Sequence, residues 1–162
     1  MGTKGTDGPH QQGHRNWKCP RCRHGCTQRN AFAPGHDAMW VSHNTGNRID
    51  YLRLNPDGTT VETAHPAIHV SAGEGQVDSL AVDAAGNIYV GMHNRAAVLV
   101  YRPNGELAAT ISAPAEDSVS SATNLAIKPG STDGYMTVSG KDGGFIYSFT
   151  ALAEGIRQSN GG

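Results

Sequence analysis

The stretch that decides the fold is residues 77–90, which reads V-D-S-L-A-V-D-A-A-G-N-I-Y-V. It holds two short apolar runs, residues 80–82 and 88–90, and each run is too short to form a helix. The segment between them ends in Gly86-Asn87, which gives the backbone the freedom that a tight reversal requires. The stretch therefore predicts a β-hairpin.

A polar pair, Asp78-Ser79, stands at the entrance of the first predicted strand of this hairpin. A carboxylate ahead of a buried strand is well placed to contribute to a binding or catalytic site. The alternative is that Asp78 only caps a turn, as aspartate commonly does. The local sequence leaves both interpretations open.

The composition favours one turn-rich β domain. A chain of 162 residues can bury a hydrophobic core, and 21 glycines with 6% aromatic and 17% charged residues suit β-structure rich in turns. A net charge of −1 gives no electrostatic reason to expect nucleic acid or an anionic membrane as partner. No apolar run approaches the roughly 18 residues of a membrane span, and the polar N-terminus is not a secretory signal. We therefore expect a cytoplasmic protein.

Residues 1–29 differ from the rest of the chain, because they are rich in Gly, Gln, His and Arg and show no strand or helix period. Such a segment buries little apolar surface, so we expect a flexible, irregular leader. Its one chemical signal is formed by Cys19, Cys22 and Cys26, which with a nearby histidine could hold zinc. Adventitious metal binding or disulfide chemistry is the alternative, since no second cysteine pair follows downstream.

From residue 30 onward the sequence repeats. Met39-Trp40-Val41 recurs as Ile88-Tyr89-Val90 after 49 residues and as Met136-Thr137-Val138 after a further 48. An apolar run precedes each copy, at residues 31–34, 80–83 and 125–128, and another follows it, at residues 48–52, 98–101 and 146–149. A fourth strand fits after the first two units, at residues 60–63 and 107–111.

A repeat of roughly 40 to 50 residues with four short strands is typical of a β-propeller blade. The alternative is a β-sandwich with accidental self-similarity. We predict an all-β fold in which residues 30–155 form a partial β-propeller of about three four-stranded blades. We expect residues 156–162 to be a disordered tail.

Residues 31–155 resemble the C-terminal half of the gluconolactonase and senescence-marker-protein (LRE-like) family of six-bladed propellers. The resemblance rests on A-F-A-P-G-H-D-A-M-W-V-S-H-N-T-G-N-R-I, on V-D-S-L-A-V-D-A-A-G-N-I-Y-V-G-M and on A-T-N-L-A-I-K-P-G-S-T-D-G-Y-M-T-V. It implies a partial six-bladed propeller in which the leader stands where the family's early blades are expected, as in a truncated, fused or out-of-frame chain.

The resemblance also implies a chemistry. The family hydrolyses lactones with one central divalent ion, often calcium, held by a glutamate, by Asn or Asp residues and by the aspartate of a D-G or D-S pair. Asp78 matches that aspartate, so the resemblance implies that it is a metal ligand and the carboxylate that takes a proton from water, with Ser79 as a weaker neighbour. Gln28 falls at the family's asparagine, and Asn30 is a possible substitute. The glutamate has no counterpart in the sequence.

Two function hypotheses follow. The first is a lactone or ester hydrolase that depends on Ca²⁺, or on another divalent cation such as Mg²⁺ or Zn²⁺. The second is a catalytically inactive propeller fragment that acts as a binding or self-association module. A homo-oligomer that completes the ring is compatible with both. His43 and His93 follow equivalent strands and are candidates for the substrate mouth, or else solvated loop histidines.

Overall fold

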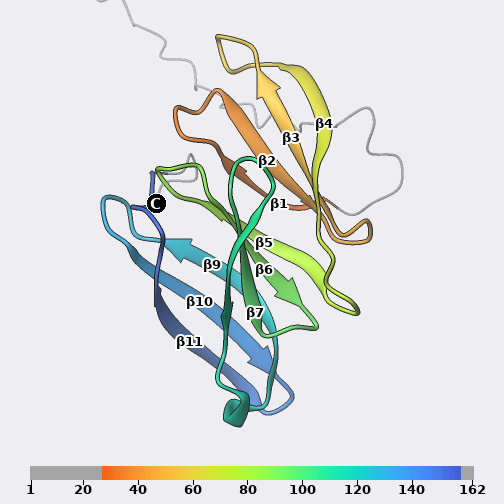
Figure 1. The fold of residues 1–162 in the computed structure, drawn as a ribbon, viewed down its shortest axis with the longest axis vertical. Helices are drawn as coiled ribbons and strands as arrows, with labels where there is room; N and C mark the ends of the chain where they lie inside the picture. The colour runs from red at the N-terminus through yellow and green to blue at the C-terminus, as the bar shows by residue number, and fades with distance from the viewer. Residues whose placement is uncertain (1–26, 158–162) are drawn as a thin grey trace, which may run out of the picture.

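The computed structural model describes residues 27–157, which fold into three antiparallel sheets arranged as successive blades (Figure 1). Residues 1–26, with the predicted zinc ligands Cys19, Cys22 and Cys26, lie outside the described residues, as do residues 158–162 of the expected tail. The first strand begins at Thr27, three residues before the expected blade boundary.

Each blade is a meander in which consecutive strands pair. The first blade contains β1 (Thr27–Phe32), β2 (Ala38–His43), β3 (Arg48–Leu54) and β4 (Val61–His69), and the second contains β5 (Gln76–Val82), β6 (Ile88–His93), β7 (Ala97–Tyr101) and β8 (Leu107–Ser112). The third contains β9 (Val119–Ile127), β10 (Asp133–Gly140) and β11 (Gly143–Thr150). The all-β prediction is confirmed, although the third blade has three strands in the described part of the chain where four were expected.

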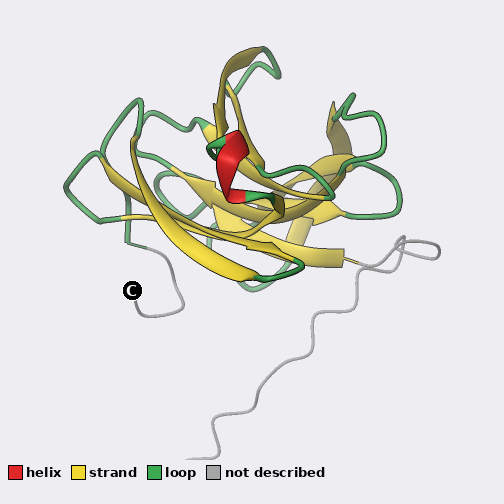
Figure 2. Ribbon diagram, turned by 90° about the horizontal axis from the view of Figure 1, so that it is seen from below, coloured by secondary structure: helices red, strands yellow, loops and turns green. Residues whose placement is uncertain are grey.

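Helix is almost absent from residues 27–157. The one helical segment there is a short 3₁₀ turn, η1 (Ala115–Asp117), between the second and third blades (Figure 2). No helix in this part of the chain is long and apolar enough to cross a bilayer.

The predicted hairpin is formed by β5 and β6. Leu80, Ala81 and Val82 pair with Val90, Tyr89 and Ile88, and Gly86 adopts φ +79° in the turn, a conformation that favours glycine.

Two hydrophobic cores lie between the blades. The inner strand β5 contacts both β1 and β9, so the second blade is covered on both faces. The first core joins Trp40 and Ile49 of the first blade to Leu80 of the second, and the second core joins Tyr89 to Leu125 of the third blade. Because side chains alternate along a strand, neighbouring residues of β5 serve different cores.

The third repeat is offset from its sequence alignment. Leu125 lies opposite Met136 and Ala126 opposite Tyr135, as Leu80 lies opposite Val90 and Ala81 opposite Tyr89. Tyr135 is therefore the structural equivalent of Tyr89, in place of Thr137, which the apolar runs had aligned with it. The shift is two residues, so it leaves each side chain on the same face of the sheet.

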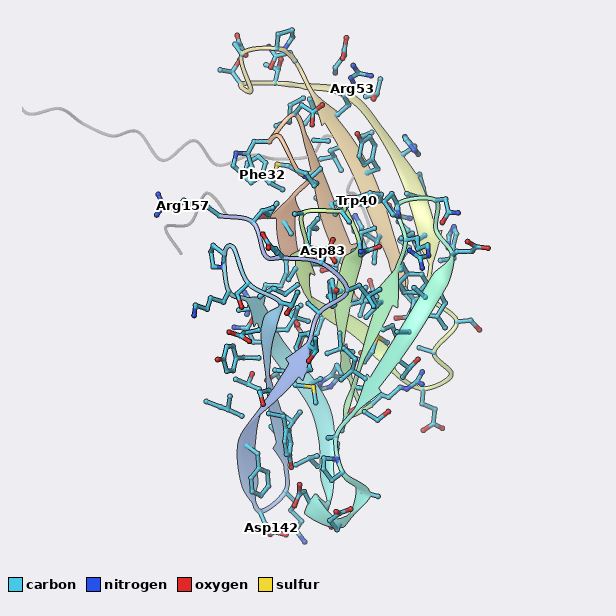
Figure 3. The ribbon with its side chains drawn as sticks, turned by 60° about the vertical axis from the view of Figure 1, so that its left-hand side comes forward. Phe32, Trp40, Arg53, Asp83, Asp142 and Arg157 are labelled. Carbon is cyan, nitrogen blue, oxygen red and sulfur yellow. The ribbon has the colours of Figure 1, made fainter. Side chains whose placement is uncertain are left out.

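The C-terminal segment, residues 151–157, runs past the β1–β2, β5–β6 and β9–β10 turns (Figures 1 and 3). Ala84 N donates to Glu154 O at 2.7 Å, and Gly155 N donates to Ser131 O at 2.9 Å. His36 Nε2 lies 3.0 Å from Arg157 O. One segment thus connects the same end of all three blades.

Candidate functional site

Asp78 and Ser79 form a β-bulge in β5. The register passes from Val77 opposite Met92 to Leu80 opposite Val90, so both bulge residues lie opposite the single residue Gly91. Bulges redirect side chains and are common beside functional sites. Asp78 is half-buried, and its carboxylate forms no hydrogen bond or ion pair with any residue of the described part. It is a carboxylate available for a ligand.

Ser79 has a different environment from Asp78. It is 1% exposed, and its hydroxyl is buried without a hydrogen-bond partner in the described structure. A Cβ at Gly91 would collide with this hydroxyl and stand 2.8 Å from Ala122 O, so Ser79 lies over Gly91 on the side of the third blade. The hydroxyl fills the space that the missing Gly91 side chain leaves.

The first blade repeats the bulge. Thr27 lies opposite His43 and Asn30 opposite Val41, so residues 28 and 29 both lie opposite Ser42. Gln28 therefore occupies the backbone position in the first blade that Asp78 occupies in the second. Asn30 lies beyond the bulge at the position of Leu80. Because Leu80 faces the preceding blade, Asn30 belongs to the face of the first blade turned away from the second.

Side chains of the first blade hold the chain that leads into the bulge. Asn47 accepts a hydrogen bond from Val77 N at 2.9 Å and donates to Gly75 O at 2.7 Å. Asn44 donates to Val77 O at 3.0 Å, and Ser42 Oγ donates to Asp78 O at 2.9 Å. The entrance to the inner strand is thereby fixed by four contacts.

Sequence reasoning missed this positioning role. The motif S-H-N-T-G-N, residues 42–47, carries all three contributing side chains, but its residue pattern gives no sign of contacts with the next blade. Ser42 also accepts a hydrogen bond from Arg29 N at 3.1 Å, so one hydroxyl joins the bulges of the first and second blades.

The two candidate histidines lie in unlike environments. His43 is 3% exposed, and its Nε2 lies 3.0 Å from Asp50 Oδ2, while Arg48 Nε donates to Asp50 Oδ1 at 3.0 Å. His43 is therefore part of a polar cluster inside the first blade and not a solvated loop residue. His93 is exposed, with Nδ1 3.5 Å from Ser121 Oγ of the third blade.

The described residues do not complete a metal site. Calcium takes about six to eight oxygen ligands, commonly with several carboxylates among them. Within residues 27–157, no three His, Cys, Asp or Glu side chains come together in an arrangement that could hold an ion. Asp78 can supply one ligand, and Ser79 is buried against Gly91. These residues of one chain do not fit a resident ion without ligands from elsewhere.

Comparisons with known proteins agree with the fold. The family model described as SMP-30/Gluconolactonase/LRE-like region matches residues 5–139. Lactonase drp35 of Staphylococcus aureus is 30% identical over 88 residues, which are 54% of this chain and 27% of that protein.

Two solved structures share the fold of this chain. A protein assigned as a gluconolactonase has a TM-score of 0.63 at 26% identity, covering 81% of this chain and 40% of that chain. A luciferin-regenerating enzyme has a TM-score of 0.67 at 16% identity, a likeness of fold alone, covering 81% of this chain and 47% of that one.

These matches confirm the partial propeller, and the aligned residues span less than half of each of these proteins. The match to the family model begins at residue 5, so it includes most of residues 1–29, although none of the motifs quoted above lies there. Because that model matches well over half of the residues, the chain belongs to the SMP-30/gluconolactonase/LRE-like family.

Proposed function

We propose that this chain supplies the aspartate-bearing part of a lactone or ester hydrolase of the gluconolactonase type. The observation that carries the proposal is the Asp78 carboxylate, which is half-buried at a bulge of an inner strand and unpaired within the described residues. The likeness to a staphylococcal protein named a lactonase supports the same substrate class, a small cyclic ester.

Asp78 is suited to the proton transfer that hydrolysis requires. An ionised carboxylate only accepts hydrogen bonds, so it can orient the attacking water and take its proton as the oxygen adds to the ester carbonyl. The contacts of Asn44, Asn47 and Ser42 fix the backbone on which this carboxylate stands. Such positioning reduces the entropy that the reaction must lose.

A divalent cation completes the proposal. Calcium, or another ion such as Mg²⁺ or Zn²⁺, would take Asp78 as one ligand, with the remaining oxygen donors supplied outside the described residues. When bound, the ion would polarise the ester carbonyl and favour the developing oxyanion.

The second candidate is a non-catalytic binding or self-association module. It is favoured by the lack of a three-residue ligand cluster within residues 27–157 and by the exposed apolar residues of the third blade, among them Ile146 at 72%.

The test is hydrolysis of a simple aromatic lactone, with added calcium and with a chelator. We expect activity that requires the ion and falls by about 100-fold or more in Asp78→Asn, which keeps the shape of the side chain and removes its charge. Asp37→Asn is the matched control, because Asp37 is an exposed aspartate in the β1–β2 turn, at the end of β1 opposite to its bulge. It should retain full activity.

Three results separate the alternatives. Chelator-resistant activity would overturn the metal proposal, and equal loss in Asp78→Asn and Asp37→Asn would overturn the role of Asp78. A folded protein without activity in the presence of calcium would overturn the enzyme proposal and favour the binding module.

A further inference from the structure

The two junctions between blades share one pattern. In the first blade Ala31 lies opposite Trp40, and in the second Ala81 lies opposite Tyr89. Each small–aromatic pair faces the next blade and is buried there, with Trp40 6% and Tyr89 0% exposed. The pair thus marks the face by which one blade packs on its successor.

The third blade carries the same face, and within residues 27–157 no other blade packs on it. Ala126 lies opposite Tyr135 at the equivalent positions, but Ala126 is exposed and Tyr135 is 46% exposed. Ile146 on β11 lies opposite Thr137, on the same face as Tyr135, and is 72% exposed. We call this surface, formed by Ala126, Tyr135, Thr137 and Ile146, the open face of the third blade.

The complementary surface is on the first blade. In the second blade Ile88 and Tyr101 lie opposite each other, face the first blade and are 0% and 6% exposed. The equivalent pair in the first blade is Met39 and Leu52, which lie opposite each other on the face turned away from the second blade. Both are only half-buried. The first blade therefore carries an apolar face of the kind that covers a preceding blade.

We propose that the open face of the third blade binds the first blade of a second copy of this chain. The contact would continue the junction pattern seen twice within the chain, since one copy carries both of the matching faces. Two such contacts related by a two-fold axis close a ring. In a solved structure of the same fold the aligned part of this chain covers 47% of the residues, so a ring of that size has room for the blades of two copies.

This assembly goes beyond the proposed hydrolysis, because it rests on blade packing and not on turnover. It would bring two Asp78 residues into one ring and cover both exposed sheet faces. Lactone hydrolysis and solution mass can therefore fail separately, and a paired but inactive protein would overturn only the enzyme proposal.

The experiment is the solution mass of the full chain, by size-exclusion chromatography with light scattering at micromolar concentration. We expect twice 17.0 kDa for the wild type and 17.0 kDa for Ile146→Arg and for Leu52→Arg, each with an unchanged β-sheet circular dichroism spectrum. Leu107→Arg is the matched control, since Leu107 is 55% exposed on the outer strand of the second blade, away from both faces. This variant should remain a dimer with twice the mass of one chain.

Mixing the two arginine variants tests the head-to-tail geometry. A mixed pair keeps one contact in which both surfaces are wild type, so the mixture should recover part of the doubled mass that neither variant shows alone. If Ile146→Arg loses its sheet spectrum, Ile146→Ser replaces it. A monomeric wild type, or an Ile146 variant that remains a dimer, would overturn the proposal. Mixing without recovery would overturn the head-to-tail contact.

Discussion

Tyr89→Phe should weaken the connection between the second blade and the C-terminal segment. Tyr89 is fully buried, and its hydroxyl donates to Asp83 Oδ2 at 3.0 Å and accepts from Leu152 N at 2.7 Å. Phenylalanine keeps the ring in the second core and removes only this oxygen. Asp83, labelled in Figure 3, retains its contact with Asn87 Nδ2 at 2.8 Å.

The size of the effect follows from the groups left behind. Each lost hydrogen bond costs about 1 kcal/mol of net stability, and a buried polar group without a partner costs more. Two bonds to Tyr89 therefore correspond to a loss of roughly 2 kcal/mol. For a domain of this size, about 3 to 5 °C of melting temperature corresponds to 1 kcal/mol, so Tm should fall by about 6 to 10 °C.

Thermal and urea denaturation, followed by circular dichroism, measure this loss. Tyr101→Phe is the matched control, because Tyr101 is also buried, at 6% exposure, and its hydroxyl forms no hydrogen bond within the described residues. It should change stability by less than about 0.5 kcal/mol. If Tyr89→Phe were no less stable than Tyr101→Phe, the hydroxyl would not connect the segment to the blade.

Two further predictions concern the second blade. Burial raises the pKa of Tyr89 above its ordinary value of 10.0 and also raises the pKa of Tyr101, so above about pH 10 the unfolded chain binds fewer protons than the folded one. The free energy of unfolding should therefore fall as pH rises beyond about 10. Urea unfolding at about pH 9 and about pH 11 measures this fall, which should be smaller in Tyr89→Phe than in the wild type because only Tyr101 then contributes to it. Gly91→Ala should lose about 1–3 kcal/mol, because its Cβ would collide with the Ser79 hydroxyl beside Ala122 O, whereas Ser79→Ala should match or exceed the wild type. Equal unfolding midpoints for Gly91→Ala and the wild type would contradict the close approach.

The strands could be predicted because a blade is a local structure. Apolar runs of three to five residues separated by turn glycines give the hairpins directly, and Gly58 and Gly105 adopt a positive φ in the turns that follow β3 and β7. The strand β4 extends to His69, well past the expected residues 60–63, because its pairing with β3 stabilises a largely exposed sequence of mixed polarity. Pairing overrides local propensity there.

The site could be predicted only in part. The D-S pair of the resemblance pointed to Asp78, and counting back from Val41 against the family's pattern pointed to Gln28. The bulge itself depends on which residue of β6 lies opposite, and the sequence of β5 alone does not contain that information. The burial of His43 depends in the same way on β3, which brings Asp50 to within 3.0 Å of it.

The third blade shows why an apolar run does not fix equivalence. Moving a strand by two residues leaves every side chain on its own face, so the alignments that match Tyr89 with Tyr135 or with Thr137 fit the apolar pattern equally well. Only the register, with Tyr135 opposite Ala126, decides between them. The difference matters for the open face. With Thr137 as the equivalent residue, that face would lack the aromatic side chain that both buried junctions possess. With Tyr135 it carries that side chain, and the inference of a second copy depends on this assignment.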